Sequence, residues 1–452
     1  FACFTSVPNV NFSVFSYWCP PHFLNPRLKV SSLSNQKIFC VILITELKNY
    51  IKMVHDSRGR DPHSRMDIGK NLIGRTRSRS RAMQRNRSKS RAARFDARDA
   101  APEVNDESIN KFVQYKNFGL LATECSRVIA IDEIPEVTER WQVVIKVKAS
   151  TVSLTDCYIR RGIWHDKISL PATPGFDVVG TIVAMGDIVE SAGFDYGEAV
   201  AACCRTGGNS RYCVLNYKDL TSVPGNVDSA QAACIISTYM TAYQALHRCK
   251  PRGPKQSLEG VNILVTGGNG PIGKAVIELA HRAGASKIFA TAAKKYHADL
   301  TAEGVCPLPL DSKMWLQLVK GKMDIVIDGI CQDGYASPRA ALNAKGHLII
   351  IGMTLLMNGA EAGMCGTPLD AAVTYFKSGW MMSATTRYCP YESSQKKPDE
   401  WKHDMEYLFA LLARNKIKPN VVNRVSLDAV PYTQQKLEAG EIDGLVVCKP
   451  WK

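Results

Sequence analysis

A glycine-rich turn between an apolar run and an amphipathic helix limits the fold of this chain more than any other feature. Residues 261–284 read V-N-I-L-V-T-G-G-N-G-P-I-G-K-A-V-I-E-L-A-H-R-A-G. Gly267, Gly270 and Gly273 stand at a spacing that permits a sharp turn, leaves room for a pyrophosphate and lets the helix lie close to the strand. Ile272 lies in the first turn of the helix, whose free amides and positive dipole end favour phosphate. The stretch therefore predicts a dinucleotide-binding strand, turn and helix.

The residues after the next strand distinguish between cofactors. Sites for NAD usually carry an acid about 20 residues beyond the turn, where it accepts hydrogen bonds from the ribose. Here strand 287–291 runs into Thr291, Lys294 and Lys295, and no acid follows before Asp299. A hydroxyl and two ammonium groups attract a 2′-phosphate, so the pattern predicts NADPH. The alternative is that both lysines are solvated at the start of a helix, as most lysines are.

Strand and helix patterns alternate through the second half of the chain. The predicted elements are strand 263–266, helix 272–282, strand 287–291, strand 324–328, helix 336–343 and strand 347–351. Alternation of this kind predicts an α/β fold with a doubly wound parallel sheet that binds its ligand at the carboxyl ends of the strands. Elsewhere from Phe112 onward, the pattern predicts strands at 143–149, 196–200 and 212–214, and a long strand between two turns within 173–186. It also predicts helix 229–246, helix 400–414, and strands near 421 and 446.

The positive charge of the chain is concentrated near its N-terminus. Of a formal net charge of +15, most lies in residues 75–98, which hold ten Lys or Arg residues and one acid. This Arg/Ser-rich segment has almost nothing apolar to bury, which predicts disorder. Such a segment can bind RNA or anionic lipid through counterion release, and serine phosphorylation can tune that binding. A solvated linker is the other interpretation.

Residues 1–52 and the cysteines bear on where the protein resides. The longest apolar run of the N-terminal region, 38–44, is too short to span a bilayer. Translation is expected to start at Met53, which would make the first 52 residues an unprocessed leader or not part of the product. The 15 cysteines show no disulfide framework spacing, which favours reduced thiols and a cytoplasmic protein without a membrane span.

Five motifs occur in the order found in a known superfamily. Val152–Gly162 corresponds to the pattern N-x-x-D-x-x-x-R-x-G, with Ser153 in place of Asn, and Pro174–Gly180 corresponds to P-G-x-[DE]-x-x-G. Thr241–Leu246 corresponds to T-A-Y-x-A-L. The last two motifs are the glycine loop Gly267–Gly273 and Ile351–Met353 at a later strand end. From Phe112 onward the sequence resembles the medium-chain dehydrogenase/reductases, most closely their zinc-free quinone oxidoreductase (zeta-crystallin-like) branch.

The resemblance implies a domain organisation. Residues 112–235 and 386–452 would form a GroES-like, β-rich catalytic domain, and residues 236–385 a Rossmann NADP-binding domain inserted between its two parts. Residues 1–111 would precede them as a disordered region, leader or basic tail. Members of the family commonly dimerise through the edge of the Rossmann sheet, so a homodimer is expected.

The same resemblance argues against a metal. Zinc alcohol dehydrogenases of the superfamily carry a Cys-His-Thr-Asp run, a Gly-His-Glu and a later Cys, and this chain has Leu154, Phe176 and Ser237 near the corresponding positions. Leucine and phenylalanine cannot ligate zinc. An acceptor reduced without a Lewis acid must already be conjugated, which favours a small-molecule quinone or α,β-unsaturated carbonyl (an enone) that receives hydride from NADPH.

Three residues are candidates for the chemistry of the site. The resemblance places Tyr158 where its hydroxyl can donate to the forming enolate, and the alternative is a packing tyrosine. Asp156 is expected to bind Arg160 or backbone. Ser153 is a candidate contact to the nicotinamide ribose or the substrate.

Further cofactor contacts follow from the resemblance. Thr241 would bind the carboxamide, Asn269 would support the glycine turn, and the backbone of Gly352 and Met353 would pass beneath the nicotinamide. Two other functions stay open: an RNA-binding zeta-crystallin-like protein that uses the basic tail, and an enoyl-thioester reductase.

Overall fold

The computed structural model describes residues 107–162, 164, 168–248, 257–352 and 384–452. The chain divides into two compact units, Phe1–Asp96 and Ala97–Lys452. Every element below belongs to the second unit. The predictions made for residues 1–52, for the basic segment 75–98 and for Met353 lie outside the described residues.

The first large sheet has seven strands in the order β14-β15-β3-β4-β5-β7, and β6 pairs with β3. Its strands are β3 (Gln142–Val152), β4 (Asp177–Met185), β5 (Ala199–Cys203), β6 (Tyr212–Asn216), β7 (Thr221–Ser222), β14 (Val421–Val425) and β15 (Leu445–Cys448). Val143, Ile145 and Val147 alternate onto one face of β3 and join one buried cluster. Ala149 joins another cluster, because the pairing of β3 with β4 shifts its register between Val147 and Ala149. All pairs in this sheet are antiparallel except β14 with β15.

The second large sheet is parallel throughout and has six strands in the order β10-β9-β8-β11-β12-β13. Its strands are β8 (Asn262–Thr266), β9 (Lys287–Thr291), β10 (Cys306–Leu308), β11 (Met323–Asp328), β12 (Leu342–Ile350) and β13 (Thr385–Arg387). Ile263 and Val265 of β8 pack in one apolar cluster and Leu264 in another. Both faces of the sheet are therefore buried, which explains the uninterrupted apolar run at β8.

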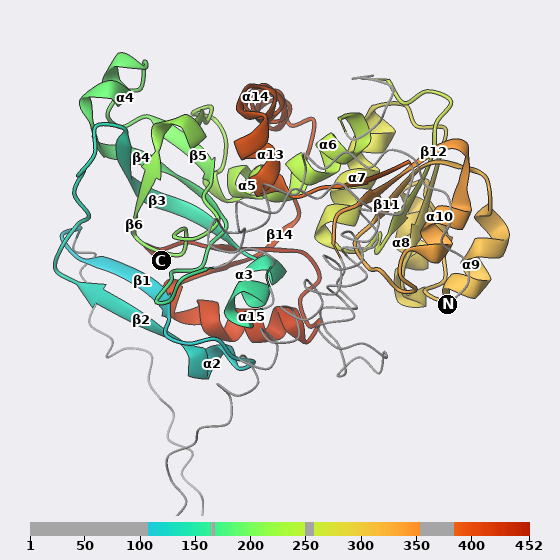
Figure 1. Ribbon diagram of the computed structural model, residues 1–452, viewed down its shortest axis with the longest axis horizontal. Coiled ribbons are helices and arrows are strands. Elements are labelled where there is room, and N and C mark those ends of the chain that lie inside the picture. Colours follow the sequence, from blue (N-terminus) through green and yellow to red (C-terminus); the bar gives the residue numbers. More distant parts are fainter. Residues whose placement is uncertain (1–106, 163, 165–167, 249–256, 353–383) are drawn as a thin grey trace, which may run out of the picture. The chain divides into compact units, whose positions relative to one another are not determined.

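Helices cover both faces of the parallel sheet. Helix α7 (Pro271–Arg282) shares a cluster with Ile263 and Val265, whereas α9 (Ser312–Val319) and α10 (Ala336–Ala341) share one with Leu264; Figure 1 shows α9 and α10 together in orange. The remaining helices are α2 (Ala122–Cys125), α3 (Leu154–Arg160), α4 (Asp187–Ser191), α5 (Ser229–Cys234), α6 (Met240–His247), α8 (His297–Ala302), α13 (Pro390–Lys396), α14 (Pro398–Ala413) and α15 (Val430–Glu438). A two-stranded antiparallel sheet, β1 (Asn110–Tyr115) with β2 (Ser126–Ile131), completes the unit.

The predicted α/β class, with a β-rich sheet and a parallel sheet, is confirmed. Two predicted elements differ in extent. The helix expected over 229–246 is divided by a π-helix at Ile235–Tyr239, and the helix expected over 336–343 ends at Ala341 because Leu342 pairs with Met323 and begins β12. The domain boundaries stay a prediction, and β13 of the parallel sheet straddles the expected boundary at 385/386.

Candidate cofactor and acceptor site

The glycine loop is a tight turn closed by hydrogen bonds to the neighbouring strand. Gly267 has φ of +72°, and its amide donates to the Thr291 hydroxyl over 3.0 Å. The amide of Gly268 donates to the Thr291 carbonyl over 2.9 Å. A Cβ added at Gly273 would lie 2.3 Å from the Gly267 carbonyl oxygen, so the helix reaches this turn only because position 273 is glycine.

The N-terminus of α7 presents backbone donors beside this turn. Gly270 caps the helix, and Pro271 at the first helical position has no N–H. The Lys274 amide closes the first turn on the Gly270 carbonyl over 2.9 Å. Among the described residues, the amides of Ile272 and Gly273 have no acceptor. Free amides at the positive end of a helix dipole form an anion site, which is what a pyrophosphate requires.

The carboxyl ends of neighbouring strands meet at the same edge. At the end of β11, the buried Asp328 carboxylate accepts the Thr266 hydroxyl from the end of β8 over 2.6 Å and the Ile330 amide over 2.7 Å. Burial raises the pKa of Asp328. Beyond β12, the Gly352 carbonyl accepts the Tyr335 hydroxyl over 3.0 Å. The predicted site residues Gly267, Thr291 and Gly352 thus belong to the ends of three strands of one sheet edge.

The two lysines proposed for the 2′-phosphate follow β9 directly. Lys294 and Lys295 are exposed on a short 3-10 helix, Lys294–Tyr296. The Lys295 ammonium lies 4.6 Å from the centroid of the Tyr296 ring, and its hydrogen bond with Tyr296 raises its pKa. Thr291 is buried and its hydroxyl oxygen is used by the glycine loop. The exposure of both lysines suits either a phosphate contact or a solvated surface.

Helix α3 is held at its N-terminus by Ser153 and Asp156. One Asp156 oxygen accepts the backbone and hydroxyl hydrogens of Ser153, both over 2.9 Å, and the other accepts the Gly175 amide over 2.9 Å. The Ser153 hydroxyl in return accepts the Asp156 amide. Burial raises the pKa of Asp156. Of the two partners expected for Asp156, the backbone is therefore observed.

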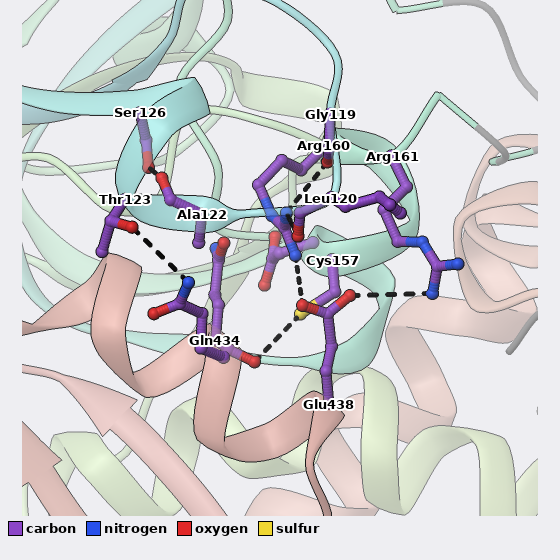
Figure 2. A network of polar contacts seen from close by, with 12 residues as sticks. Gly119, Leu120, Ala122, Thr123, Ser126, Cys157, Arg160, Arg161, Gln434 and Glu438 are labelled. Atoms are coloured by element: carbon purple, nitrogen blue, oxygen red, sulfur yellow. Dashed lines mark hydrogen bonds and ion pairs between the residues drawn. The ribbon is translucent and has the colours of Figure 1, made fainter. Parts of the chain in front are cut away.

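Arg160 was the other partner expected for Asp156. Its ion pair is instead with Glu438 of α15 (Figure 2). The Arg160 side chain is fully buried and also donates to the carbonyls of Gly119, over 2.9 Å, and Leu120. Arg161 lies 3.8 Å from the same Glu438 carboxylate. This network fixes the C-terminal end of α3 to α15 and to the turn before α2.

Aromatic side chains form another part of the candidate site, namely Tyr158 and a cluster of rings around Phe176. Tyr158, on α3, is largely buried. Phe176 packs edge-to-face with Trp164 at 6.1 Å and with Tyr391 at 6.4 Å between ring centroids. The cation of Arg205 lies 5.7 Å from the Tyr391 ring centroid. Phe176 thus lies in an aromatic cluster.

Asp177 is a buried acid to which sequence reasoning assigned no role. One carboxylate oxygen accepts the hydroxyls of Thr151, over 3.0 Å, and Ser237, over 2.5 Å. The other oxygen is buried and has no hydrogen-bond partner among the residues that the structure describes. Burial raises the pKa of Asp177 to about 7, and the nearby Asp156 acts in the same direction. Its position in the P-G-x-[DE]-x-x-G motif was the available signal.

Ser237 belongs to the π-helix that precedes Thr241. Thr241 is buried on α6. The Tyr239 hydroxyl donates to Glu278 of α7 over 2.5 Å, which joins the π-helix to the helix of the glycine loop. The π-helix is thus bonded to β4 through Asp177 and to α7 through Tyr239. Turns of π-helix are frequent at functional sites. Asn269 lies on the glycine turn, half-buried.

No group of three or more His, Cys, Asp or Glu side chains gathers as a metal site in the part of the chain that the structure describes. Over the same residues, no helix combines the length and apolar character needed to cross a bilayer.

Comparisons with known proteins agree with this geometry. Residues 139–249 match the family described as the alcohol dehydrogenase GroES-like domain. A quinone oxidoreductase of Lama guanicoe is 29% identical over 225 residues, which cover 48% of this chain and 66% of that protein. A chloroplastic NADPH-dependent alkenal/one oxidoreductase of Arabidopsis thaliana is 33% identical over 209 residues, 44% of this chain and 52% of that protein. The chain thus spans slightly less than two thirds of the first of these relatives and about half of the second.

A solved structure shows the same fold. The Escherichia coli quinone oxidoreductase, crystallised with NADPH, superposes with a TM-score of 0.61 at 17% identity and covers 75% of this chain and 100% of its own.

Proposed function

Because this chain belongs to the quinone oxidoreductase branch of the medium-chain dehydrogenase/reductase superfamily of oxidoreductases, we propose that it reduces quinones or α,β-unsaturated carbonyls with NADPH and without zinc. The observation that carries the proposal is the turn at Gly267–Gly273, where a Cβ at Gly273 would strike the Gly267 carbonyl. That close approach leaves the free amides of α7 facing the carboxyl edge of the parallel sheet.

The residues of this edge fit a phosphorylated dinucleotide. The amides of Ile272 and Gly273 would hold the pyrophosphate, and Lys294 and Lys295 would attract the 2′-phosphate. Thr241 and the Gly352 backbone are the proposed nicotinamide contacts, together with Met353. When bound, NADPH supplies a hydride. The relatives named for alkenal/one and quinone reduction support this choice of cofactor and acceptor.

Side chains of this unit would then stabilise the negative charge that develops on the acceptor and donate a proton to it. Ser153 and Asp156 cap α3 and so fix the position of Tyr158. The proposed role of the Tyr158 hydroxyl is to donate its proton to the acceptor oxygen as negative charge develops there. A donor of this kind suffices only for a conjugated acceptor, which agrees with Leu154 and Phe176 at the positions of zinc ligands.

The first test compares nucleotides. Purified protein is expected to oxidise NADPH with a quinone or an enone. Exchanging Lys294 and Lys295 for Glu should raise KM for NADPH by about tenfold or more and leave KM for NADH nearly unchanged, because each lost ion pair acts only on the 2′-phosphate. Lys345→Glu, an exposed lysine elsewhere, is the matched control. No NADPH oxidation with any such acceptor would contradict the proposal, and an equal effect on both nucleotides would refute the lysine role.

The basic segment 75–98 supports a second candidate, RNA binding by a cytoplasmic, dimeric protein of this branch. The full chain is then expected to bind single-stranded RNA in a salt-dependent manner. Deletion of residues 54–98 should abolish that binding and leave NADPH oxidation intact. RNA binding that survives the deletion would exclude the segment as its source.

A further inference from the structure

Helix α9 carries an exposed apolar stripe on the face that points away from the parallel sheet. Its inner residues Trp315 and Val319 are buried in the core of that sheet. On its outer side, Leu310, Met314 and Leu318 are 55%, 58% and 58% exposed. Met314 and Leu318 are spaced four apart and therefore share one face of the helix. Leu310 precedes the N-cap Asp311 and lies just outside the helix. These three residues are called the α9 stripe. None of the three side chains belongs to the buried apolar clusters of the described residues.

A row of cations runs beside the stripe. Lys313, in the first turn of α9, and Lys320, the residue that caps its C-terminus, are exposed and are called the lysine row. Neither has a carboxylate within ion-pair distance among the described residues. Residues 312–322 contain no acid, and the carboxylate of Asp311 accepts the Lys313 amide as the helix cap. Over residues 310–322, three lysines face the single acid Asp311, so large apolar side chains lie beside a net positive charge.

This combination limits the possible occupants. A second copy of the chain, docked stripe to stripe, would bring two lysine rows together, and like charges oppose such a pairing. A nucleic acid would satisfy the lysines but leave the stripe in water. An anionic bilayer satisfies both, because its acyl boundary receives apolar side chains and its headgroups attract the adjacent lysines.

We propose that the α9 face, stripe and lysine row together, rests on the surface of anionic lipid membranes. The helix would lie in the plane of the interface, with the stripe among the upper acyl carbons and the lysine row at the phosphates. The association is peripheral and reversible, and it brings the enzyme to a phase in which apolar acceptors dissolve. The inference does not depend on the proposed reductase activity.

Vesicle flotation of the full chain tests the proposal. Wild-type protein is expected to float with vesicles of phosphatidylcholine and phosphatidylserine and to stay in solution with phosphatidylcholine alone. The double variants Met314→Ser with Leu318→Ser, and Lys313→Glu with Lys320→Glu, should each reduce the bound fraction about tenfold. Tyr196→Ser, which removes an equally exposed apolar side chain elsewhere, should bind as the wild type does. Circular dichroism melting confirms that all variants fold.

The basic segment 75–98 is present in every protein compared, so it cannot produce the difference between them. If both double variants float as well as the wild type, that segment alone binds the lipid and the proposal is overturned. It is equally overturned if the wild type ignores phosphatidylserine, if the variants instead lose RNA binding, or if the stripe variant turns a dimer into a monomer in light scattering while leaving lipid binding unchanged.

Discussion

Replacing Asp177 by Asn should remove a pH dependence of folding stability that one buried carboxyl creates. The Asp177 side chain is fully buried. Two hydroxyls, of Thr151 and Ser237, donate to one of its oxygens, and the other has no partner. Asparagine can accept both hydroxyl hydrogen bonds with its carbonyl oxygen but cannot ionise. The substitution therefore separates the effect of charge from the effect of shape.

The magnitude follows from the pKa of Asp177, which burial raises from 3.8 to about 7. The folded chain binds this proton more tightly than the unfolded chain does. Its contribution to stability is therefore complete below pH 3.8 and is lost as the pH rises through about 7. The full span is about 4 kcal/mol, of which about 2 kcal/mol is lost between about pH 5.5 and about pH 8.

Urea unfolding at those two pH values measures the effect. The stability difference between Asp177→Asn and wild type should move in favour of the variant by about 2 kcal/mol on going from the lower pH to the higher. The cost of an unpaired Asn amide is the same at both pH values and cancels. Asp299→Asn, at an exposed acid, should show no such change. A difference between Asp177→Asn and wild type that is independent of pH would refute the reasoning.

Two further substitutions test the glycine loop and the network of Figure 2. Gly273→Ala places a Cβ 2.3 Å from the Gly267 carbonyl oxygen and should weaken NADPH binding at least tenfold in a fluorescence titration. Gly225→Ala, at a position with open space around it, should leave NADPH binding unchanged. Equal affinities of the two variants would show that α7 can move away from the turn without loss of binding. Glu438→Gln leaves the buried Arg160 without its counter-charge and should lower the free energy of unfolding by about 3 kcal/mol, whereas Asp187→Asn breaks only an exposed pair and should change it little.

The parallel sheet and its glycine loop were accessible from the sequence because their signals are local. Strand, turn and helix follow one another within residues 261–284, and each is determined by its own periodicity and by glycines whose spacing has a steric meaning. The alternating pattern beyond them places Thr291 and Gly352 at the carboxyl ends of strands of one parallel sheet without knowledge of any long-range contact.

The polar network around α3 was not accessible in the same way. Asp156 and Arg160 are four residues apart and carry opposite charges, which favours an ion pair on one helix face. The fold instead supplies Glu438, which is 278 residues from Arg160 in the sequence, and a backbone amide at Gly175 that satisfies Asp156. A nearby charge in the sequence is a poor guide when a distant element brings a better-placed partner.

The π-helix at Ile235–Tyr239 was missed for a different physical reason. The sequence contains no glycine or proline between residues 229 and 246, so the pattern shows one helix but cannot show that its hydrogen bonds widen by one residue. The determinant is tertiary, since Ser237 turns its hydroxyl to Asp177 and Tyr239 turns its hydroxyl to Glu278. These two hydrogen bonds reach different elements, β4 and α7. The extra residue in the π-helical turn rotates the residues that follow it about the helix axis, and Thr241 at the start of α6 is among them.

The resemblance to the zinc-free branch has a consequence for Asp177. In a Gly-His-Glu sequence the acid stands next to a zinc ligand, and a metal's positive charge favours the ionised carboxylate. Here the preceding residue is Phe176, which packs against Trp164 and Tyr391, and Asp177 accepts hydrogen bonds from the hydroxyls of Thr151 and Ser237. Burial is the largest influence on the pKa of Asp177 and raises it to about 7. A Phe176→His variant that bound zinc is therefore expected to have a lower pKa at Asp177.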